Sequence, residues 1–361
     1  MNEITDPQPG RVIATGPVLD TAKQVLTDCL QASARLYMHF TRTTLEHLGD
    51  GGEAVVRDSL RGYGAWRGAE MRQAHAALGE DINVETLIRR WDSASTYVVK
   101  DELESEGTYS PHDVSFDVTY CPASLAWKEE GFHRWGHVYC DEFHQAAATS
   151  YHPDALVVIP INMMKGDDRC AFRWAMPNRT LENAEPQAPA EVTDLGRFLA
   201  PLYGRTDDEV DGMRLALTRT NRLLAGRYLT YIRAIVDRHG KDLADEIARV
   251  ALTSWATDRG ARLARRPGTR GLDAAELWER IDLAPALTWR ASLGDTGRLH
   301  AIVTGTPLDD TWQHYDAARW AELFWQVSLP AFFAPLHPGA EVRVVTSPER
   351  AAGLAEILID G

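Results

Sequence analysis

The sequence lacks the short motifs that hold nucleotides and those that mark the most common hydrolases. It contains no GxxxxGK(S/T) phosphate loop, no GxGxxG after a strand, no GxSxG elbow and no HExxH pair. These absences argue against nucleotide chemistry and against hydrolases of the serine-elbow type.

Basic residues and long apolar runs are scarce too. Lys and Arg number 38 against 52 Asp and Glu, and the formal charge of −14 argues against a nucleic-acid partner or an anionic membrane surface. No apolar stretch approaches the roughly 20 residues of a membrane span, and the N-terminal MNEITDPQPG is acidic and Pro-rich, unlike a signal peptide. We therefore expect a cytoplasmic protein whose partner is a small-molecule substrate.

Cysteine is also rare, with four residues in a chain of 361. Four are too few for a disulfide framework, and a reducing compartment would leave them as thiols or metal ligands. The hydrophobic content of 44% suffices to build the cores of two ordinary domains or one large one.

What the chain does contain is an internal repeat. With the offset 306 − 121 = 185, the segment from Cys121 aligns without a gap to the segment from Thr306, and two tryptophans, an arginine and an HP dipeptide fall in register. Upstream, the offset 259 − 67 = 192 aligns the RGA tripeptides that begin at Arg67 and Arg259. We infer an ancient duplication.

The repeat divides the chain into two predicted domains. The first copy covers residues 20–176 and the degenerate second copy covers 212–361, while the Pro-rich segment 177–211 reads as a linker and lead-in helix. Each copy is expected to be α+β, with helices packed on a small antiparallel sheet. We expect the two copies to form a pseudo-dimer within a monomeric chain.

Periodicity places the elements of the first copy. Apolar spacing predicts helices over 20–47, 53–78 and about 135–150, with a short helix carrying SLAWKEEG. The stretch HDVSFDVTY alternates as a half-buried strand does, and ALVVIPI with RCAFRW predicts a hairpin across KGDD.

The segment HVYCDEFH carries a stripe of reactive side chains. On a helix, positions i, i+3, i+4 and i+7 share one face, and here these are His137, Cys140, Asp141 and His144. The stripe does not repeat, because at +185 the second copy has Glu322, Trp325, Gln326 and Leu329. Chemistry kept in one copy only points to a catalytic first copy and a second copy that acts as its partner.

Plain structural roles compete with this interpretation. A free cysteine is most often a small core residue, and a helical histidine is most often on the surface or hydrogen-bonded in the core. Asp168 could simply belong to the hairpin turn. Arg67 and Trp127 occur in both copies, which suits scaffold; together with Cys121, Cys170 and Asp168 they form the predicted substrate-binding set.

The pattern CPASLAWKEEGF, YCDEFH, YHPD and KGDDRCAFRW resembles the L-2-amino-thiazoline-4-carboxylic acid hydrolase family over about residues 30–176. This chain has His152 where the family usually has Asn before the proline. The order of elements is also similar to the vinyl-reductase-type ligand-binding domains and to trafficking-complex subunits with an α/β plait. The hydrolase-family resemblance implies an enzyme that opens a small thiazoline-like ring, and the fused second copy suits a specialised, natural-product pathway.

The residues suit such chemistry without a cofactor. We predict that the Cys140 thiolate attacks the C=N carbon, that His144 or His137 transfers protons, and that Asp141 orients an imidazole. Flanking histidines would lower the pKa of Cys140 and make it the most reactive thiol, with Cys121 as its competitor at a helix N-terminus.

A different class of function remains open at this point. Cys121, Cys140, Cys170 and His144 could instead close a tetrahedral zinc site in a ligand-binding or sensor module without catalysis.

Overall fold

The computed structural model describes residues 16–92, 107–177, 191–204, 208–269, 272, 274–294, 299–350 and 352–360. Residues 178–190 and 205–207 of the predicted linker and lead-in helix lie outside this set. Among the described helices, none combines the length and the apolar character needed to cross a membrane.

The chain forms two compact units. Unit 1 comprises Met1–Thr27 and Leu60–Thr220, and unit 2 comprises Asp28–Ser59 and Asn221–Gly361. The unit boundaries fall inside the three long helices α1 (Gly16–Leu48), α2 (Gly52–Ala77) and α9 (Glu209–His239). The predicted domains 20–176 and 212–361 follow chain order, whereas the compact units interleave along the chain.

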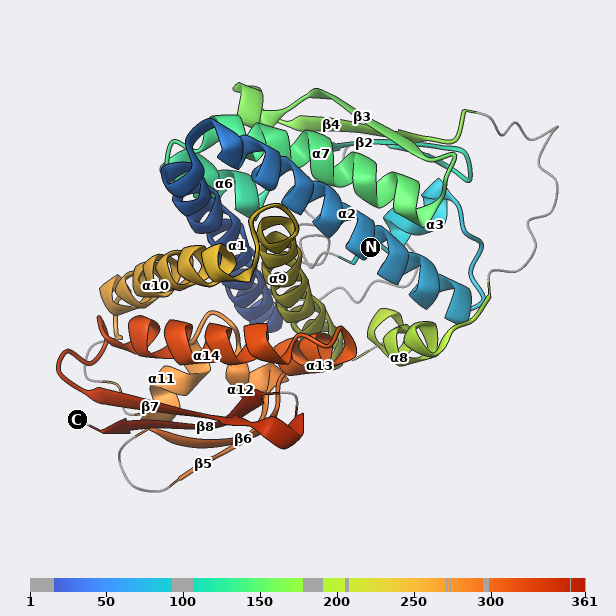
Figure 1. The fold of residues 1–361 in the computed structure, drawn as a ribbon. Helices are drawn as coiled ribbons and strands as arrows, with labels where there is room; N and C mark the ends of the chain where they lie inside the picture. Colours follow the sequence, from blue (N-terminus) through green and yellow to red (C-terminus); the bar gives the residue numbers. More distant parts are fainter. Residues whose placement is uncertain are drawn as a thin grey trace. The chain divides into compact units, whose positions relative to one another are not determined.

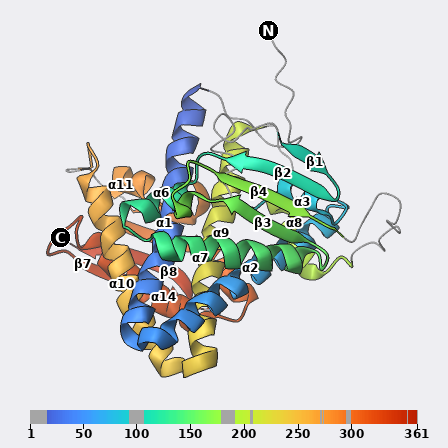
Figure 2. The same ribbon diagram turned by 90° about the horizontal axis from the view of Figure 1, so that it is seen from above.

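Unit 1 consists of helices on one four-stranded antiparallel sheet (Figure 1). Figure 2 shows its strands side by side in the order β1, β2, β4, β3. Besides parts of α1, α2 and α9, its elements are α3 (Val84–Arg89), β1 (Thr108–Ser110), β2 (Asp113–Val118), α6 (Pro122–Glu129), α7 (His133–Tyr151), β3 (Leu156–Ile161), η2 (Met163–Lys165), β4 (Cys170–Ala175) and α8 (Asp194–Tyr203). The predicted helices, strand and hairpin are confirmed to within a few residues at their ends.

Unit 2 has the same sheet topology, with the order β5, β6, β8, β7. Besides parts of α1, α2 and α9, and η1 (Gly49–Gly51), its elements are α10 (Lys241–Arg265), α11 (Ala274–Arg280), α12 (Pro285–Thr288), β5 (Arg290–Leu293), β6 (His300–Gly305), α13 (Pro307–His314), α14 (Ala318–Phe333), β7 (Glu341–Ser347), η3 (Pro348–Arg350) and β8 (Gly353–Asp360). In Figure 1, α14 lies along this sheet as α7 lies along the sheet of unit 1.

The helix that follows the second strand begins in the same way in both units. Pro122 and Pro307 occupy the first turn of α6 and α13, where the missing N–H costs nothing. The residue before each proline caps the helix: the Cys121 sulfur accepts from the Ser124 N–H, and the Thr306 hydroxyl accepts from the Asp309 N–H. These shared details support the predicted duplication.

Glycines let the long helices approach α7 and α14 closely. A Cβ atom at Gly64 or Gly68 of α2 would overlap the carbonyl oxygens of Phe143 and Ala147 on α7. In unit 2, a Cβ atom at Gly260 of α10 would meet the carbonyl of Phe332 on α14. The glycines therefore set the depth and rotation of the helix that carries the reactive stripe.

We expect Gly68→Ala to destabilise the protein by about 1–3 kcal/mol, because the added methyl has no room against Ala147. Helix propensity alone predicts the opposite sign, since alanine favours helices over glycine by about 1 kcal/mol. Urea unfolding measures the difference, with Gly51→Ala as the control because no atom lies within 4 Å of the added group. A stabilised Gly68→Ala protein would contradict the close packing.

Candidate functional site

The reactive stripe of α7 is divided by its packing against β4. Cys140 and His144 lie on the side that faces the sheet, where the His144 ring is 5.1 Å from the ring of Phe172 and 6.0 Å from that of Trp174. Residues 170, 172 and 174 alternate on the same inner face of β4, so Cys170 continues this row toward Cys140. The packed half of the stripe is thus one thiol and one imidazole.

The other half of the stripe points toward solvent. His137 Nε2 lies 2.9 Å from Asp141 Oδ2, and the two side chains are 30% and 51% exposed. The four positions span about 100° of the helix, and only one edge of that arc meets the sheet. The predicted catalytic roles of His137 and Asp141 therefore receive no support from the described contacts, because this ion pair lies on the outer surface.

Three cysteines from distant parts of unit 1 converge. Cys121 caps α6, Cys140 lies on α7 and Cys170 begins β4. The Ser124 hydroxyl of α6 and the Cys170 sulfur both contact Met163 of η2, and the Cys121 thiol acts on the ionisation of both Cys140 and Cys170. The Met163 N–H also donates to Cys170 Sγ at 3.3 Å. The sequence predicted all three as site residues but could not show that they lie together.

Burial disfavours ionisation of these thiols to different degrees. It raises the pKa of Cys140 well above its ordinary value, and the neighbouring thiols of Cys121 and Cys170 raise it further. It raises the pKa of Cys170 to about 11. The pKa of Cys121 is raised by burial but opposed by the N–H groups of Ser124 and Ala123 and by the charge of Lys128.

His144 is a neutral imidazole at physiological pH. Its Nδ1 lies 2.7 Å from the Cys140 carbonyl oxygen, and because a carbonyl can only accept, Nδ1 carries the proton and Nε2 is a free acceptor. Burial, helped by the nearby charge of Arg67, lowers the pKa of His144 to about 4. The expected activation of Cys140 by an imidazolium therefore finds no support at His144, since burial disfavours the charged form of this ring.

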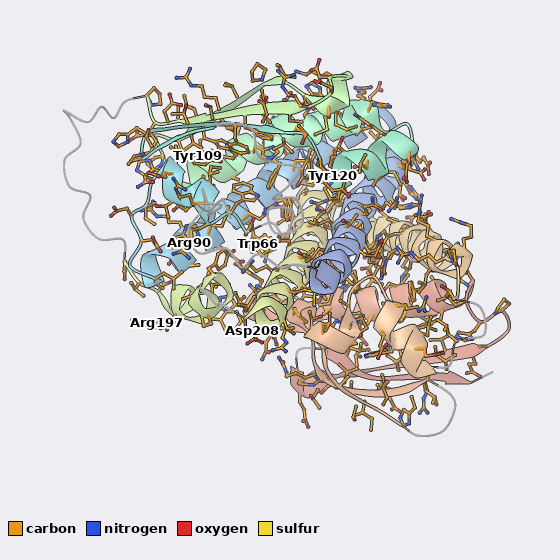
Figure 3. All side chains as sticks on the ribbon, turned by 180° about the vertical axis from the view of Figure 1, so that it is seen from behind. Trp66, Arg90, Tyr109, Tyr120, Arg197 and Asp208 are labelled. Atoms are coloured by element: carbon orange, nitrogen blue, oxygen red, sulfur yellow. The ribbon has the colours of Figure 1, made fainter. Side chains whose placement is uncertain are left out.

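Arg67 is held in a buried ion pair. It donates from Nε to Asp92 Oδ2 at 2.8 Å and from Nη2 to Asp92 Oδ1, and its guanidinium stacks over the rings of Phe143, Trp91 and Tyr63. Trp66 of α2, labelled in Figure 3, stacks in turn on Tyr63 with ring centroids 6.0 Å apart.

Asp92 determines the charge state of this guanidinium. Burial lowers the pKa of Arg67, but the charge and hydrogen bonds of Asp92, together with the nearby Tyr63 and Tyr139, more than offset this, so the pKa lies above its ordinary value. The charge expected to hold a substrate carboxylate is already neutralised by Asp92.

The two remaining predicted substrate-binding residues, Trp127 and Asp168, have the surroundings of ordinary structural residues. Trp127 is 1% exposed and packs its ring 5.0 Å from that of Tyr139, as a core residue does. The Asp168 side chain is 83% exposed and pairs with Arg169 at 3.2 Å. Both observations agree with the plain structural roles considered above.

Sequence reasoning missed two residues at the centre of unit 1, Asp92 and Asn162. Asp92 could have been found from the repeat, because the offset 282 − 92 = 190 aligns it with Asp282, which forms the same buried pair with Arg259. Asn162 is fully buried beside Cys140 and Cys170, and nothing in its spacing signals this.

The zinc alternative finds no support in the geometry. Over the described ranges, which include Cys121, Cys140, Cys170 and His144, no group of three or more His, Cys, Asp or Glu side chains is arranged to hold a metal ion.

A thiol-bearing α+β unit is thus the class that the fold and site define. Residues 30–174 match the family model described as L-2-amino-thiazoline-4-carboxylic acid hydrolase. The family resemblance is thereby confirmed for this part of the chain, and the family description implies hydrolase activity. No curated protein and no solved structure matches the chain.

We expect Asp92→Asn to cost about 3–5 kcal/mol of stability, because it leaves the buried Arg67 charge without its partner. The control is Asp113→Asn, which removes the partner of Arg173 from an ion pair whose side chains are 40% and 60% exposed. That change should cost far less stability than Asp92→Asn, because solvent screens the exposed pair. Equal losses in the two variants would show that burial does not govern the Arg67 pair.

His144 should also make stability depend on pH. Its pKa of about 4 in the folded protein lies below the ordinary value of 6.5. The unfolded chain therefore binds a proton more readily, so the free energy of unfolding is highest above pH 6.5 and falls as the pH drops toward 4. Between pH 7.5 and 5, the loss should be about 2 kcal/mol. His144→Phe should remove this part of the slope, whereas His75, whose pKa is about 3, remains in both proteins. Unfolding curves with the same pH dependence for parent and variant would refute a buried neutral imidazole.

Proposed function

We propose that unit 1 is a thiol-dependent hydrolase that acts on a C–N or C–S bond of a small heterocyclic or amidine-like substrate. The observation that carries the proposal is the convergence of Cys121, Cys140 and Cys170 within the segment that matches the family. The family description names 2-amino-thiazoline-4-carboxylate, and we take this compound as the model substrate.

Cys121 is the thiol best placed to act as the nucleophile. Its sulfur lies 3.4 Å from the Ser124 amide nitrogen at the start of α6, where helix N–H groups favour a thiolate. Thr306 caps the equivalent helix of unit 2, and a hydroxyl is a better cap than a neutral thiol because sulfur accepts hydrogen bonds weakly. A cysteine where capping alone favours threonine supports a chemical role for the sulfur.

Cys140 is suited to the opposite task. Its surroundings keep it protonated, so it can act as a general acid. Enzymes often assign acid and base roles to neighbouring titratable groups whose pKa values differ. Addition of the Cys121 sulfur to the C=N carbon places an electron pair on nitrogen, which takes the Cys140 proton. The neutral His144, with Nε2 free to accept a hydrogen bond, is proposed to orient the substrate beside them.

Unit 2 is proposed to lack this chemistry. At the position equivalent to Cys140, Trp325 donates its indole N–H to Asp309 at 2.9 Å, and the Trp325 ring is fully buried. A small pocket in this unit is lined mainly by Trp278, Trp289, Trp325 and other apolar side chains. The Trp325 ring thus stands at the position of Cys140, and Thr306 and Ala355 stand at those of Cys121 and Cys170.

The test is turnover of 2-amino-thiazoline-4-carboxylate by single cysteine variants. Cys121→Ser should lose at least about a hundredfold in kcat/KM, because a hydroxyl at this position is not ionised. Cys29→Ser is the control, since Cys29 lies in unit 2 and is 1% exposed. No turnover by the parent protein, or full turnover by Cys121→Ser, would overturn the proposal.

Brief alkylation with substoichiometric iodoacetamide at neutral pH provides a second measure. Peptide mapping should mark Cys121 before Cys140, with protection by substrate. The interpretation from sequence placed Cys140 first, and the same experiment decides between the two orders.

A further inference from the structure

Asn162 occupies an unusual position between the cysteines. It follows β3 and caps the short helix η2, and its side chain is fully buried. Its Oδ1 lies 3.9 Å from Cys170 Sγ, and its amide group affects the ionisation of Cys140. A polar side chain is thus enclosed between two thiols that belong to different elements.

The orientation of the Asn162 side chain is fixed from two sides. Oδ1 accepts the N–H of Met164 at 2.8 Å, and the Asn162 backbone N–H donates to Asp167 Oδ2 at 2.7 Å. Because Oδ1 is committed to the helix cap, the Nδ2 group must point the other way. A flip of the amide would break the cap.

The Nδ2 group has no hydrogen-bond acceptor among the described residues, although it is shielded from solvent. A buried N–H donor without an acceptor is costly and uncommon in folded proteins. The nearby thiols are weak acceptors when protonated, whereas a thiolate is a strong one. The donor would therefore gain a good partner only when a neighbouring sulfur ionises.

We propose that the Asn162 amide N–H stabilises the Cys140 thiolate that forms when Cys140 gives its proton to the substrate nitrogen. The inference rests on the proposed function and adds a catalytic residue to it. The S–H bond of Cys140 breaks, the substrate nitrogen gains the proton, and the electron pair stays on sulfur, where Nδ2 can donate to it. The adduct then collapses with cleavage of the ring C–S or C–N bond, and the leaving atom keeps the electron pair. Water next adds its hydroxyl to the substrate carbon while its proton returns to the Cys140 thiolate. Collapse of this second adduct forms C=O and releases the Cys121 thiolate, and the hydroxyl proton passes to the atom that left.

A donor placed where charge develops is a general device of enzymes, because it needs no rearrangement during the reaction. The other titratable groups that act on Cys140 are Cys121, Cys170 and Asp141, and all three oppose its ionisation. Among the described residues, Asn162 is the group whose hydrogen bond lowers the pKa of Cys140 and so favours its thiolate.

Unit 2 offers an internal comparison. The offset 347 − 162 = 185 aligns Asn162 with Ser347, the residue directly before η3. A serine side chain can cap a short helix, but it carries no amide group that could donate as Nδ2 does. The second unit thus lacks the amide donor where it also lacks the thiols.

The matched variant is therefore Asn162→Ser, which keeps a neutral capping oxygen and removes Nδ2. The rate of Cys140 alkylation by iodoacetamide is followed from pH 7 to 11 by peptide mapping of the full chain. Because burial keeps the Cys140 thiol mostly protonated below about pH 9, a rise of its midpoint by about one pH unit in the variant lowers its alkylation rate about tenfold at each pH from about 7 to 9, while the rate of Cys121 stays unchanged.

Asn162→Asp provides a second variant that also keeps the capping oxygen. It places a carboxylate where the donor was, so the Cys140 midpoint should rise further. A Cys140 midpoint equal to the parent value in either folded variant, checked by circular dichroism, would overturn the role of Asn162.

This measurement needs no substrate, so its failure is separate from failure of the proposed function. With 2-amino-thiazoline-4-carboxylate as the probe, Asn162→Ser should lower kcat at least tenfold with little change in KM. A purely structural cap would leave kcat, KM and the thiol profiles at their parent values.

Discussion

The contact of α7 with α2 at Gly64 and Gly68 is the constraint on which the site depends. Without side chains at these positions, α2 approaches the carbonyls of Phe143 and Ala147 and leaves α7 no freedom to roll on the sheet. The rotation so fixed turns Cys140 and His144 inward and leaves Asp141 outside. A bulkier side chain on α2 would shift the helix axis and with it the relation of Cys140 to Cys121 and Cys170.

Desolvation is the second determinant of the chemistry. The same enclosure that brings three thiols together opposes their ionisation and keeps His144 neutral. Local hydrogen-bond donors and the charge of Lys128 favour ionisation under these conditions; the described donors are backbone N–H groups at the start of α6, the Met163 N–H and the amide of Asn162. Which cysteine acts as the acid and which as the nucleophile therefore depends on the donor that each sulfur faces. The spacing of histidines along the helix does not predict these roles.

The elements of unit 1 could be predicted from sequence because each carries its own period and end signals. The helix ending near Gly79, the alternating strand at 113–118 and the hairpin across KGDD depend on local spacing alone. The site was predicted only in part, because one turn of helix offers an arc of candidates and tertiary packing selects among them. Asn162 and Asp92 matter through partners 8 to 25 residues away, which no local pattern encodes.

The interleaving of the units has a consequence for how the gene can be divided. Residues 28–59 belong to unit 2, where the Trp255 indole donates to the Ala32 carbonyl at 2.8 Å and Arg266 binds Asp28 at 2.6 Å. A protein expressed from the linker onward would lack these partners and would expose Trp255 and the aromatic faces of Tyr228 and Tyr231 that Phe40 covers. Because each half draws on a helix from the other stretch of the chain, a cut at the linker would divide unit 2 instead of releasing it whole.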